Sequence, residues 1–434
     1  MASPTKRMLY DVHEKPPIAR SLILGLQHVF AMFGATVLVP ILVNGGAGQE
    51  ILPIPVALAM SGVGTLIYQL CTNNKSPVYL GSSFAFIAPV IAAAAGGTPG
   101  SAYSGIMMVG LLYVVCAIVI KFVGKDWIDK ILPPIVIGPM IMIIGLGLAS
   151  FAISQIGITS GTPLDLRNVI VALVAFLVAV FCATIAKGFA KVIPFLLGII
   201  AGYVVAFPLG IVNIDAIAAS SWVGIPAFKI PFLNYNIDIV AALVMAPVAL
   251  VTISEHIGDH ISLSRIIDRD LIKDPGLDKT LMGDGVATFV AGLVGGPANT
   301  TYGENTAVVG MTKVGSVWVL RIAAIIAIVL AFFTKFTSII EAIPAPVLGG
   351  ISILLYGFIA SNGLRVLVYN RIDFGITKNV VIASSMLVLG IGGAAISIVI
   401  GDASLTFSGM SLAAIVGILL NVFIPGSESS GELD

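Results

Sequence analysis

Charged residues are scarce in this chain of 434 residues: Asp, Glu, Lys and Arg together make up 10% of it, whereas hydrophobic residues make up 58%. The 22 basic and 22 acidic side chains cancel to a net charge of zero, so no nucleic acid or other polyanionic partner is indicated. Cysteine is also scarce, and the scattered Cys71, Cys116 and Cys182 do not form a disulfide framework. The sequence has no catalytic triad, phosphate-binding loop or metal-ligand spacing. We therefore expect no enzyme, no cofactor and no metal centre.

The chain instead contains many long apolar runs. Residues 21–43, 102–123 and 317–333 are each long enough, or nearly so, to cross a hydrocarbon core about 30 Å thick. The first run is longer than the apolar part of a signal peptide and lacks a small-residue cleavage site, so we expect it to be retained as a span. These features predict an all-α polytopic protein of the cytoplasmic membrane, surrounded by the lipid bilayer.

The apolar runs divide into fourteen predicted transmembrane segments. With the N-terminus inside, this number places 19 of the 22 Lys and Arg residues on the cytoplasmic side and only Arg167, Lys229 and Lys335 outside. Such an asymmetry is what the positive-inside rule expects, and it predicts that both termini are cytoplasmic. The predicted spans lie near residues 20–43, 51–71, 78–96, 102–123, 131–153, 168–186, 192–213, 237–260, 280–297, 300–313, 315–334, 338–360, 376–397 and 406–424.

Two halves of the sequence are weakly similar. Residues 133–138 (PPIVIG) recur as 344–349 (PAPVLG), and residues 62–66 (GVGTL) recur as 285–289 (GVATF). Because each half contains seven spans, an odd number, the second half enters the bilayer from the opposite side. Inverted repeats of this kind are typical of transporters, whose substrate site lies where the repeats meet. Channels also use repeats, so a channel stays open as an alternative.

The third and tenth spans are each interrupted at their start. Residues 77–84 (PVYLGSSF) and 297–305 (PANTTYGEN) each pass from a proline through β-favouring residues to a glycine and small polar residues. This order predicts broken helices, each with a short extended strand followed by a half-helix. Irregular backbone at membrane depth survives only where it is buried in protein or lines a cavity, and a half-helix N-terminus offers N–H donors to a ligand. The alternative is two ordinary loops.

Three acids, Glu255, Asp259 and Glu304, interrupt these apolar helices. An acid within the hydrocarbon region costs several kcal/mol, roughly, and marks a site or a pathway. Glu255 and Asp259 are four residues apart and share one helix face, whereas Glu304 follows Gly303 at the start of a half-helix. For Asp259, the alternative is solvation at the membrane edge. Two carboxylates with backbone N–H groups suit a planar, amide-rich ring, and we expect no basic side chain beside them.

The histidines are less informative. His28 lies on the first span, and two interpretations stay open: it pairs with an acid, or it satisfies a buried backbone group. His256 adjoins Glu255 but points about 100° away around the helix, so it need not belong to the site. We expect His260 to lie at the membrane interface.

Four motifs in this sequence are similar to those of a known family. Residues 27–40 (QHVFAMFGATVLVP), 79–86 (YLGSSFAF), 255–258 (EHIG) and 299–305 (NTTYGEN) closely resemble the uracil permeases of the nucleobase–ascorbate transporter (nucleobase–cation symporter) family. The likeness covers nearly the whole chain. It implies fourteen spans in two inverted seven-span repeats, with spans 1–4 and 8–11 in a core domain and spans 5–7 and 12–14 in a gate domain. The segments are an N-terminal tail (1–19), core (20–123), gate (124–213), core (214–334), gate (335–424) and a C-terminal tail (425–434).

The resemblance also implies a function and a site. It implies nucleobase import coupled to a cation, usually the proton, often by homodimers whose core slides past the gate in an elevator motion. Glu255 and Glu304 would bind the amide groups of uracil. The other substrate-binding positions that we expect are Phe84, Gly303, Tyr302, Tyr356 and Ala31. Asp259, His28 and Glu304 are the expected proton-coupling residues.

The sequence departs from the family pattern at two positions. Ala307 replaces a glycine of the family signature, and the position of Asp259 is a histidine in some uracil permeases. Purine transporters of the family tend to carry glutamine where Glu304 stands, so the resemblance favours a pyrimidine. Uracil–proton symport is therefore the leading hypothesis. The alternatives are a xanthine or urate carrier, possibly coupled to sodium, and a channel for small neutral solutes; an intramembrane hydrolase lacks a nucleophile–base pair.

Overall fold

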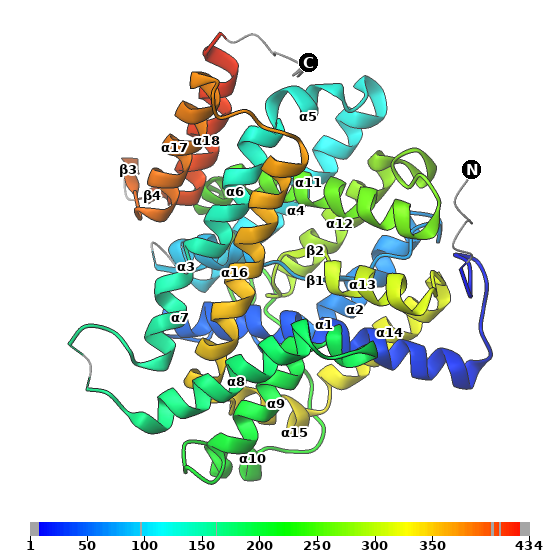
Figure 1. The fold of residues 1–434 in the computed structure, drawn as a ribbon, viewed down its shortest axis with the longest axis vertical. Coiled ribbons are helices and arrows are strands. Elements are labelled where there is room, and N and C mark those ends of the chain that lie inside the picture. The colour runs from blue at the N-terminus through cyan, green and yellow to red at the C-terminus, as the bar shows by residue number, and fades with distance from the viewer. Residues whose placement is uncertain (1–7, 96–97, 162, 401–402, 408, 426–434) are drawn as a thin grey trace.

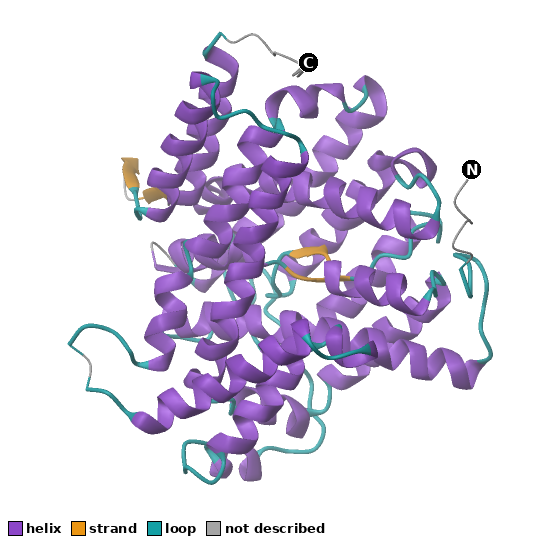
Figure 2. Ribbon diagram, in the orientation of Figure 1, coloured by secondary structure: helices purple, strands orange, loops and turns teal. Residues whose placement is uncertain are grey.

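Helices dominate the computed structural model, which describes residues 8–95, 98–161, 163–400, 403–407 and 409–425 (Figures 1 and 2). Much of both predicted tails therefore lies outside the described residues. The longer helices are α1 (Ile18–Ala47), α2 (Ile54–Cys71), α4 (Pro99–Val123), α6 (Pro134–Leu146), α8 (Leu166–Thr184), α9 (Pro194–Ala206), α11 (Ile239–Ile267), α12 (Leu277–Leu293), α14 (Val317–Ala331), α16 (Ala345–Tyr369), α17 (Thr377–Ile391) and α18 (Gly409–Phe423). The shorter ones are α3 (Ile87–Ala95), α5 (Asp126–Ile131), α7 (Ala149–Ile156), α10 (Ile214–Ala219), α13 (Gly303–Thr312) and α15 (Thr334–Glu341).

Several of these helices have the length and composition of membrane spans. Among the described residues six helices meet both requirements when α6 and α7 are taken as one helix (Pro134–Ile156). A seventh span results if α14 and α15, which are bent by 83° at their junction, count as one. Each predicted span overlaps at least one helix of the structure, but several are shorter than a full span or broken. The number fourteen and the inverted repeat stay predictions.

The two predicted breaks are present in the structure. Strand β1 (Leu80–Ser82) pairs antiparallel with β2 (Asn299–Thr301), with Leu80 opposite Thr301 and Ser82 opposite Asn299. A turn of 3-10 helix, η1 (Phe84–Phe86), then leads into α3, while α13 begins directly after β2. The strands lie near the middle of the molecule between helices of both halves (Figure 2). The predicted strand and half-helix arrangement is confirmed, and pairing satisfies backbone groups that water cannot reach.

The helices fall into two tightly packed groups. In one, α4 and α2 pack on α12, α4 packs on α11, and α14 packs on α2 and α1; in the other, α16 packs on α6, α7 and α8, α8 packs on α9, and α17 packs on α18. Small residues permit close backbone approach: a Cβ on Gly110 of α4 would lie 2.6 Å from the Gly285 carbonyl oxygen of α12. The same device joins α6 to α16, where a Cβ on Gly363 would lie 2.5 Å from the Gly138 carbonyl oxygen. The assignment of these groups to a core and a gate domain stays a prediction.

A second strand pair was not expected. The sequence predicts helix to residue 397, but α17 ends at Ile391, and β3 (Ile396–Ile400) then pairs antiparallel with β4 (Ala403–Phe407). The β-branched run of residues 396–400 (ISIVI) favours an extended backbone. Apolar composition alone does not separate such a hairpin from a helix end.

Candidate functional site

A cavity of about 660 Å³ lies between the two groups of helices. One wall comes from η1, α11, β2 and the start of α13. The opposite wall comes from α6, a 3-10 turn η2 (Gly188–Lys191), α9 and α16. Six predicted site residues line the cavity, namely Phe84, Glu255, Asp259, Tyr302, Gly303 and Glu304. The structure therefore brings together residues that are more than 200 positions apart in the sequence.

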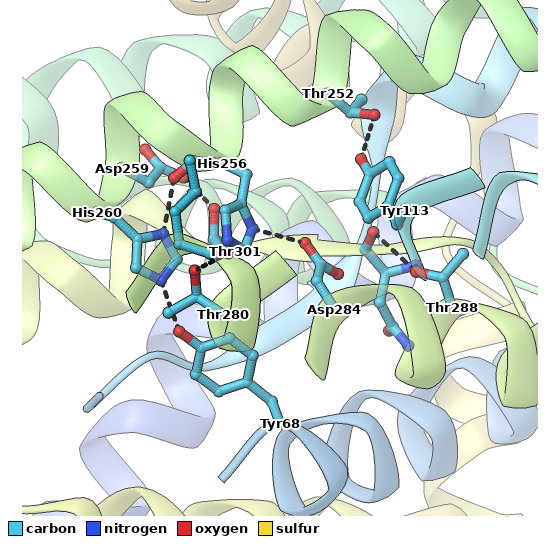
Figure 3. Close-up of polar contacts among 12 residues, drawn as sticks. Tyr68, Tyr113, Thr252, His256, Asp259, His260, Thr280, Asp284, Thr288 and Thr301 are labelled. Carbon is cyan, nitrogen blue, oxygen red and sulfur yellow. Dashed lines mark hydrogen bonds and ion pairs between the residues drawn. The ribbon is translucent and has the colours of Figure 1, made fainter. Parts of the chain in front are cut away.

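Glu255 and Asp259 project from the cavity face of α11, as their four-residue spacing predicts. The hydroxyl of Thr301, on β2, donates a hydrogen bond of 2.5 Å to Oδ2 of Asp259 (Figure 3). The strand pair thus holds one of the two acids directly. Asp259 is partly buried within the cavity wall, and its depth in the membrane stays a prediction.

The N-terminus of α13 points its first turn at the same cavity. Tyr302 precedes the helix and is 3% exposed; its hydroxyl donates to the Ser82 carbonyl oxygen at 3.0 Å and accepts from the Thr36 hydroxyl at 3.1 Å. These bonds tie α1, β1 and the start of α13 together. Glu304 lies in the first turn, where the free N–H groups and the helix dipole favour a negative charge.

Gly303 begins the half-helix that the sequence predicts. A glycine at this position suggests a need for both a permissive φ and close approach to the backbone. Its φ is not among the positive values of the described residues, and a Cβ built on it meets none of their heavy atoms within 4 Å. The conformational reason is therefore wrong, because alanine fits the backbone here. The open space beside Gly303 is space in the cavity, so close approach of a ligand stays a prediction.

Three further predicted residues are not in the cavity lining. Ala31 is 7% exposed and lies in the packed part of α1, and Tyr356 is 2% exposed on α16, where it packs in the core shared with α6. His28 is 1% exposed, and the amide of Asn305 donates to its Nδ1 at 3.2 Å and to its carbonyl oxygen at 3.1 Å. His28 therefore pairs with an amide of α13, which neither of its two interpretations had proposed.

One expectation about polar residues is wrong, and another stays a prediction. Lys191 of η2 lines the same cavity as the acids but belongs to the opposite wall, so the absence of a basic side chain beside them stays a prediction. His260 is fully buried rather than interfacial, and its Nε2 lies 2.5 Å from the hydroxyl of Tyr68 on α2. Flanking polar residues suggested an interface, but the side chain of Tyr68 reaches His260 from α2.

Asp284 was missed by the sequence analysis. This acid of α12 is fully buried, and its Oδ2 lies 2.9 Å from Nδ1 of His256 (Figure 3). The only sequence signal was an acid between two glycines in an otherwise apolar segment, which is the same reasoning that identified Glu255.

Comparisons with known proteins agree with this architecture. A family model described as "Permease family" matches residues 19–399. The chain is 47% identical to the uracil permease of Bacillus caldolyticus over 424 residues, which cover 97% of this chain and 96% of the relative. It is 45% identical to the uracil permease of Bacillus subtilis (strain 168), again covering 97% and 96%. Identity to the uracil permease of Escherichia coli (strain K12) is 39%, covering 96% and 94%.

Solved structures share the fold at low sequence identity. The transmembrane domain of the cyanobacterial bicarbonate transporter BicA aligns with a TM-score of 0.63 at 14% identity and covers 93% of this chain and 96% of that one. The murine anion transporter Slc26a9, in its inward-facing state, aligns with a TM-score of 0.67 at 12% identity and covers 94% and 68%. At these identities the likeness concerns the fold alone. The family match and the near full-length relatives establish that this chain, a multi-pass membrane protein, belongs to the Permease family and is a transporter and not an enzyme.

Proposed function

We propose that this permease imports uracil across the cytoplasmic membrane together with protons. The observation that carries the proposal is the meeting of Glu255 on α11 and Glu304 at the N-terminus of α13 in one cavity of about 660 Å³. The two N–H groups of the uracil ring suit two carboxylate acceptors, and its two carbonyl groups suit the free backbone N–H donors of α13 and η1. The names of the near full-length relatives support the same substrate.

Proton coupling rests on the crowding of carboxylates. Glu255, Asp259 and Glu304 all line one cavity, where like charges disfavour simultaneous ionisation. A proton taken up by one of them reduces this repulsion, so substrate and proton favour each other's binding. Asp259 accepts a hydrogen bond from Thr301, so it is held by the protein itself, while Glu255 and Glu304 can bind the substrate. Asp259 is therefore our candidate for carrying the coupling proton.

The position of the cavity supports an elevator motion. All three acids belong to elements of the proposed core domain, whereas α6, α9 and α16 of the proposed gate domain form the other wall. Lys191 and Asn362 in this lining are at or near residues that the positive-inside rule places at the cytoplasm, so we infer that the cavity faces inward. We also propose that both termini are cytoplasmic. A homodimer completes the proposal, because contacts between two gate domains would fix the gate against which each core domain slides.

Uptake into proteoliposomes tests the proposal. Radiolabelled uracil accumulates under an inwardly directed proton gradient, an uncoupler abolishes accumulation, and unlabelled uracil competes better than xanthine or urate. Glu255→Gln abolishes this uptake, whereas Glu50→Gln, which changes an exposed acid outside the cavity, leaves it unchanged. If xanthine or urate competes better than uracil, the proposed substrate is wrong. If accumulation depends on a sodium gradient alone, the proposed coupling ion is wrong. Uptake that ignores both gradients would indicate a channel.

A further inference from the structure

A second polar face lies on α11 behind the acids, outside the cavity lining. His256 and His260 each follow an acid by one residue, so they form a parallel stripe about 100° around the helix from Glu255 and Asp259. Both are fully buried, and their rings stack with centroids 4.1 Å apart and an interplanar angle of 28°. Figure 3 shows this stripe facing α12 and α2.

The first histidine is bonded to an acid that has no role in the cavity. Nδ1 of His256 and Oδ2 of Asp284 are 2.9 Å apart, and both side chains are 0% exposed. Within the described part of the chain, Nε2 of His256 and Oδ1 of Asp284 have no hydrogen-bond partner. A lone buried carboxylate is strongly disfavoured, so we infer that the pair carries no net charge: His256 keeps one hydrogen on Nε2, and a second proton lies between Nδ1 and Oδ2.

The second histidine has a defined tautomer. Its Nδ1 lies 2.7 Å from the carbonyl oxygen of His256, which can only accept, so this nitrogen carries the proton. Nε2 of His260 then accepts from the Tyr68 hydroxyl at 2.5 Å. Because that hydroxyl has one hydrogen, Ser76, whose hydroxyl lies 2.9 Å away, donates to it. His260 is therefore a neutral link between α11 and α2.

These links connect helices that otherwise share few contacts. Both α11 and α12 pack extensively on α4 and only slightly on each other, so the His256–Asp284 bond is a direct bridge between them. Apolar packing tolerates small rotations of a helix about its axis, whereas a buried polar pair allows one orientation. The titratable and charged groups around the bridge and the two acids of α11 are Glu255, Asp259 and Glu304 on the cavity side, Tyr113 on α4, Tyr68 on α2, His260 on α11 itself and Arg365 on α16.

We propose that His256, through its net-neutral bond to Asp284, is a positioning residue that keeps Glu255 turned toward the cavity, and that His260 with Tyr68 does the same for Asp259. The inference rests on the proposed uracil site and adds two functions to it. The bridge sets the rotation of α11. It also prevents Asp284 from adding a fourth negative charge beside the three acids that the substrate and proton use.

Two substitutions of His256 separate positioning from packing. His256→Leu removes the bond to Asp284 and should raise the Kd for uracil by about tenfold or more, because the buried carboxyl group of Asp284 loses its partner and α11 loses its bridge to α12. His256→Asn keeps a donor near the position of Nδ1 and should bind uracil within about threefold of the parent at pH 6. Asparagine cannot hold the proton that the imidazole shares with Asp284, so Asp284 should ionise at a lower pH in this variant. As the pH is raised, uracil binding should therefore weaken at a lower pH than in the parent. Parental binding by the leucine variant, or a parental pH profile for the asparagine variant, would overturn the proposal.

Tyrosine variants give a matched comparison for His260. Tyr68→Phe removes the hydroxyl that binds Nε2 of His260, whereas Tyr113→Phe removes another buried hydroxyl, which binds Thr252 one turn before the acids. Each deletes one oxygen against the same helix. We expect weaker uracil binding only in Tyr68→Phe, with both variants monodisperse and equally heat-stable in detergent. Equal losses in the two variants would assign the Tyr68 bond to general stability and refute its positioning role.

A measurement without substrate keeps this inference distinct from the proposed function. A hydrophobic carbodiimide modifies cavity carboxyl groups, and mass spectrometry maps the sites. We expect slower modification of Glu255 in His256→Leu than in the parent or His256→Asn, with unchanged modification of Glu304. Equal rates at Glu255 in all three proteins would refute positioning, even if uracil binds. A parent that binds no uracil but shows the expected labelling would refute the proposed substrate and leave positioning supported.

Discussion

The substitution Gly303→Ala should separate ligand binding from stability. Gly303 is the first residue of α13 and lines the cavity, and a Cβ there meets no described heavy atom within 4 Å. Alanine therefore adds no clash within the protein. Within a helix, alanine in place of glycine stabilises the protein by roughly 0.5–1 kcal/mol, and this gain is smaller at the first helical position. The free energy of unfolding should stay within about 1 kcal/mol of the parent value.

The new methyl group would occupy cavity space beside the first N–H donors of α13. A carbonyl group of uracil must approach such a nitrogen to about 2.9 Å to form a hydrogen bond. Losing one such bond costs about 0.5–1.5 kcal/mol, which raises the Kd roughly 2-fold to 13-fold. Valine at position 303 fills more of this space and should abolish transport.

Gly357→Ala is the matched control. Gly357 lies within helix α16, a Cβ there also meets no described heavy atom within 4 Å, and the residue is not part of the cavity lining. The assays are thermal unfolding of the purified proteins in detergent and equilibrium binding of radiolabelled uracil. A parental Kd for Gly303→Ala would show that no ligand approaches this backbone. A melting temperature well below that of Gly357→Ala would show that the site is packed rather than open.

Three further substitutions test other parts of the site. Glu304→Gln should weaken uracil binding about tenfold to a hundredfold, because a charge-assisted hydrogen bond is worth roughly 1.5–3 kcal/mol; unchanged binding in a filter assay would remove Glu304 from the site. Asp259→Asn should preserve uracil exchange between proteoliposomes and medium but lose accumulation driven by a pH gradient, and parental accumulation would place the coupling proton elsewhere. Gly81→Ala puts a Cβ 2.4 Å from ring carbons of Tyr302. This overpacking should destabilise the protein by about 1–3 kcal/mol and lower its melting temperature. An unchanged melting temperature would refute this tight contact.

Local composition was sufficient to predict the two breaks in the helical pattern. Proline at positions 77 and 297 stops a helix, and the β-favouring residues that follow extend the backbone before glycine and small polar residues reopen a helix. The sequence did not reveal that the two strands pair with each other, or in which register. Leu80 and Thr301, which lie opposite each other, are far apart in the chain, so no local pattern relates them. The acids of the cavity were predictable for a different reason, namely their cost in an apolar helix.

The histidine stripe could not be predicted, because its environment depends on the rotation of α11 and on which helices cover it. His260 precedes Ser262, Ser264 and Arg265, which is the composition of a helix end at a membrane surface. In the structure His260 is fully buried, and Tyr68 of α2 fills its remaining hydrogen-bonding position. A residue's place along a helix is readable from sequence, but its neighbour across the helix is a property of tertiary packing.

The two walls of the cavity differ in a way that bears on the proposed elevator motion. The core wall carries the three acids and the open end of α13, all of them directional hydrogen-bonding groups. The gate wall is mainly apolar, with Ile141, Ile144, Val192, Phe195, Phe358 and Ile359 in its lining. Apolar contact is non-directional, so one side chain can replace another against a bound ring at little cost. Hydrogen bonds, in contrast, must stay intact while a polar substrate is away from water. A substrate held by the core and only covered by the gate can therefore move with the core without breaking its polar contacts.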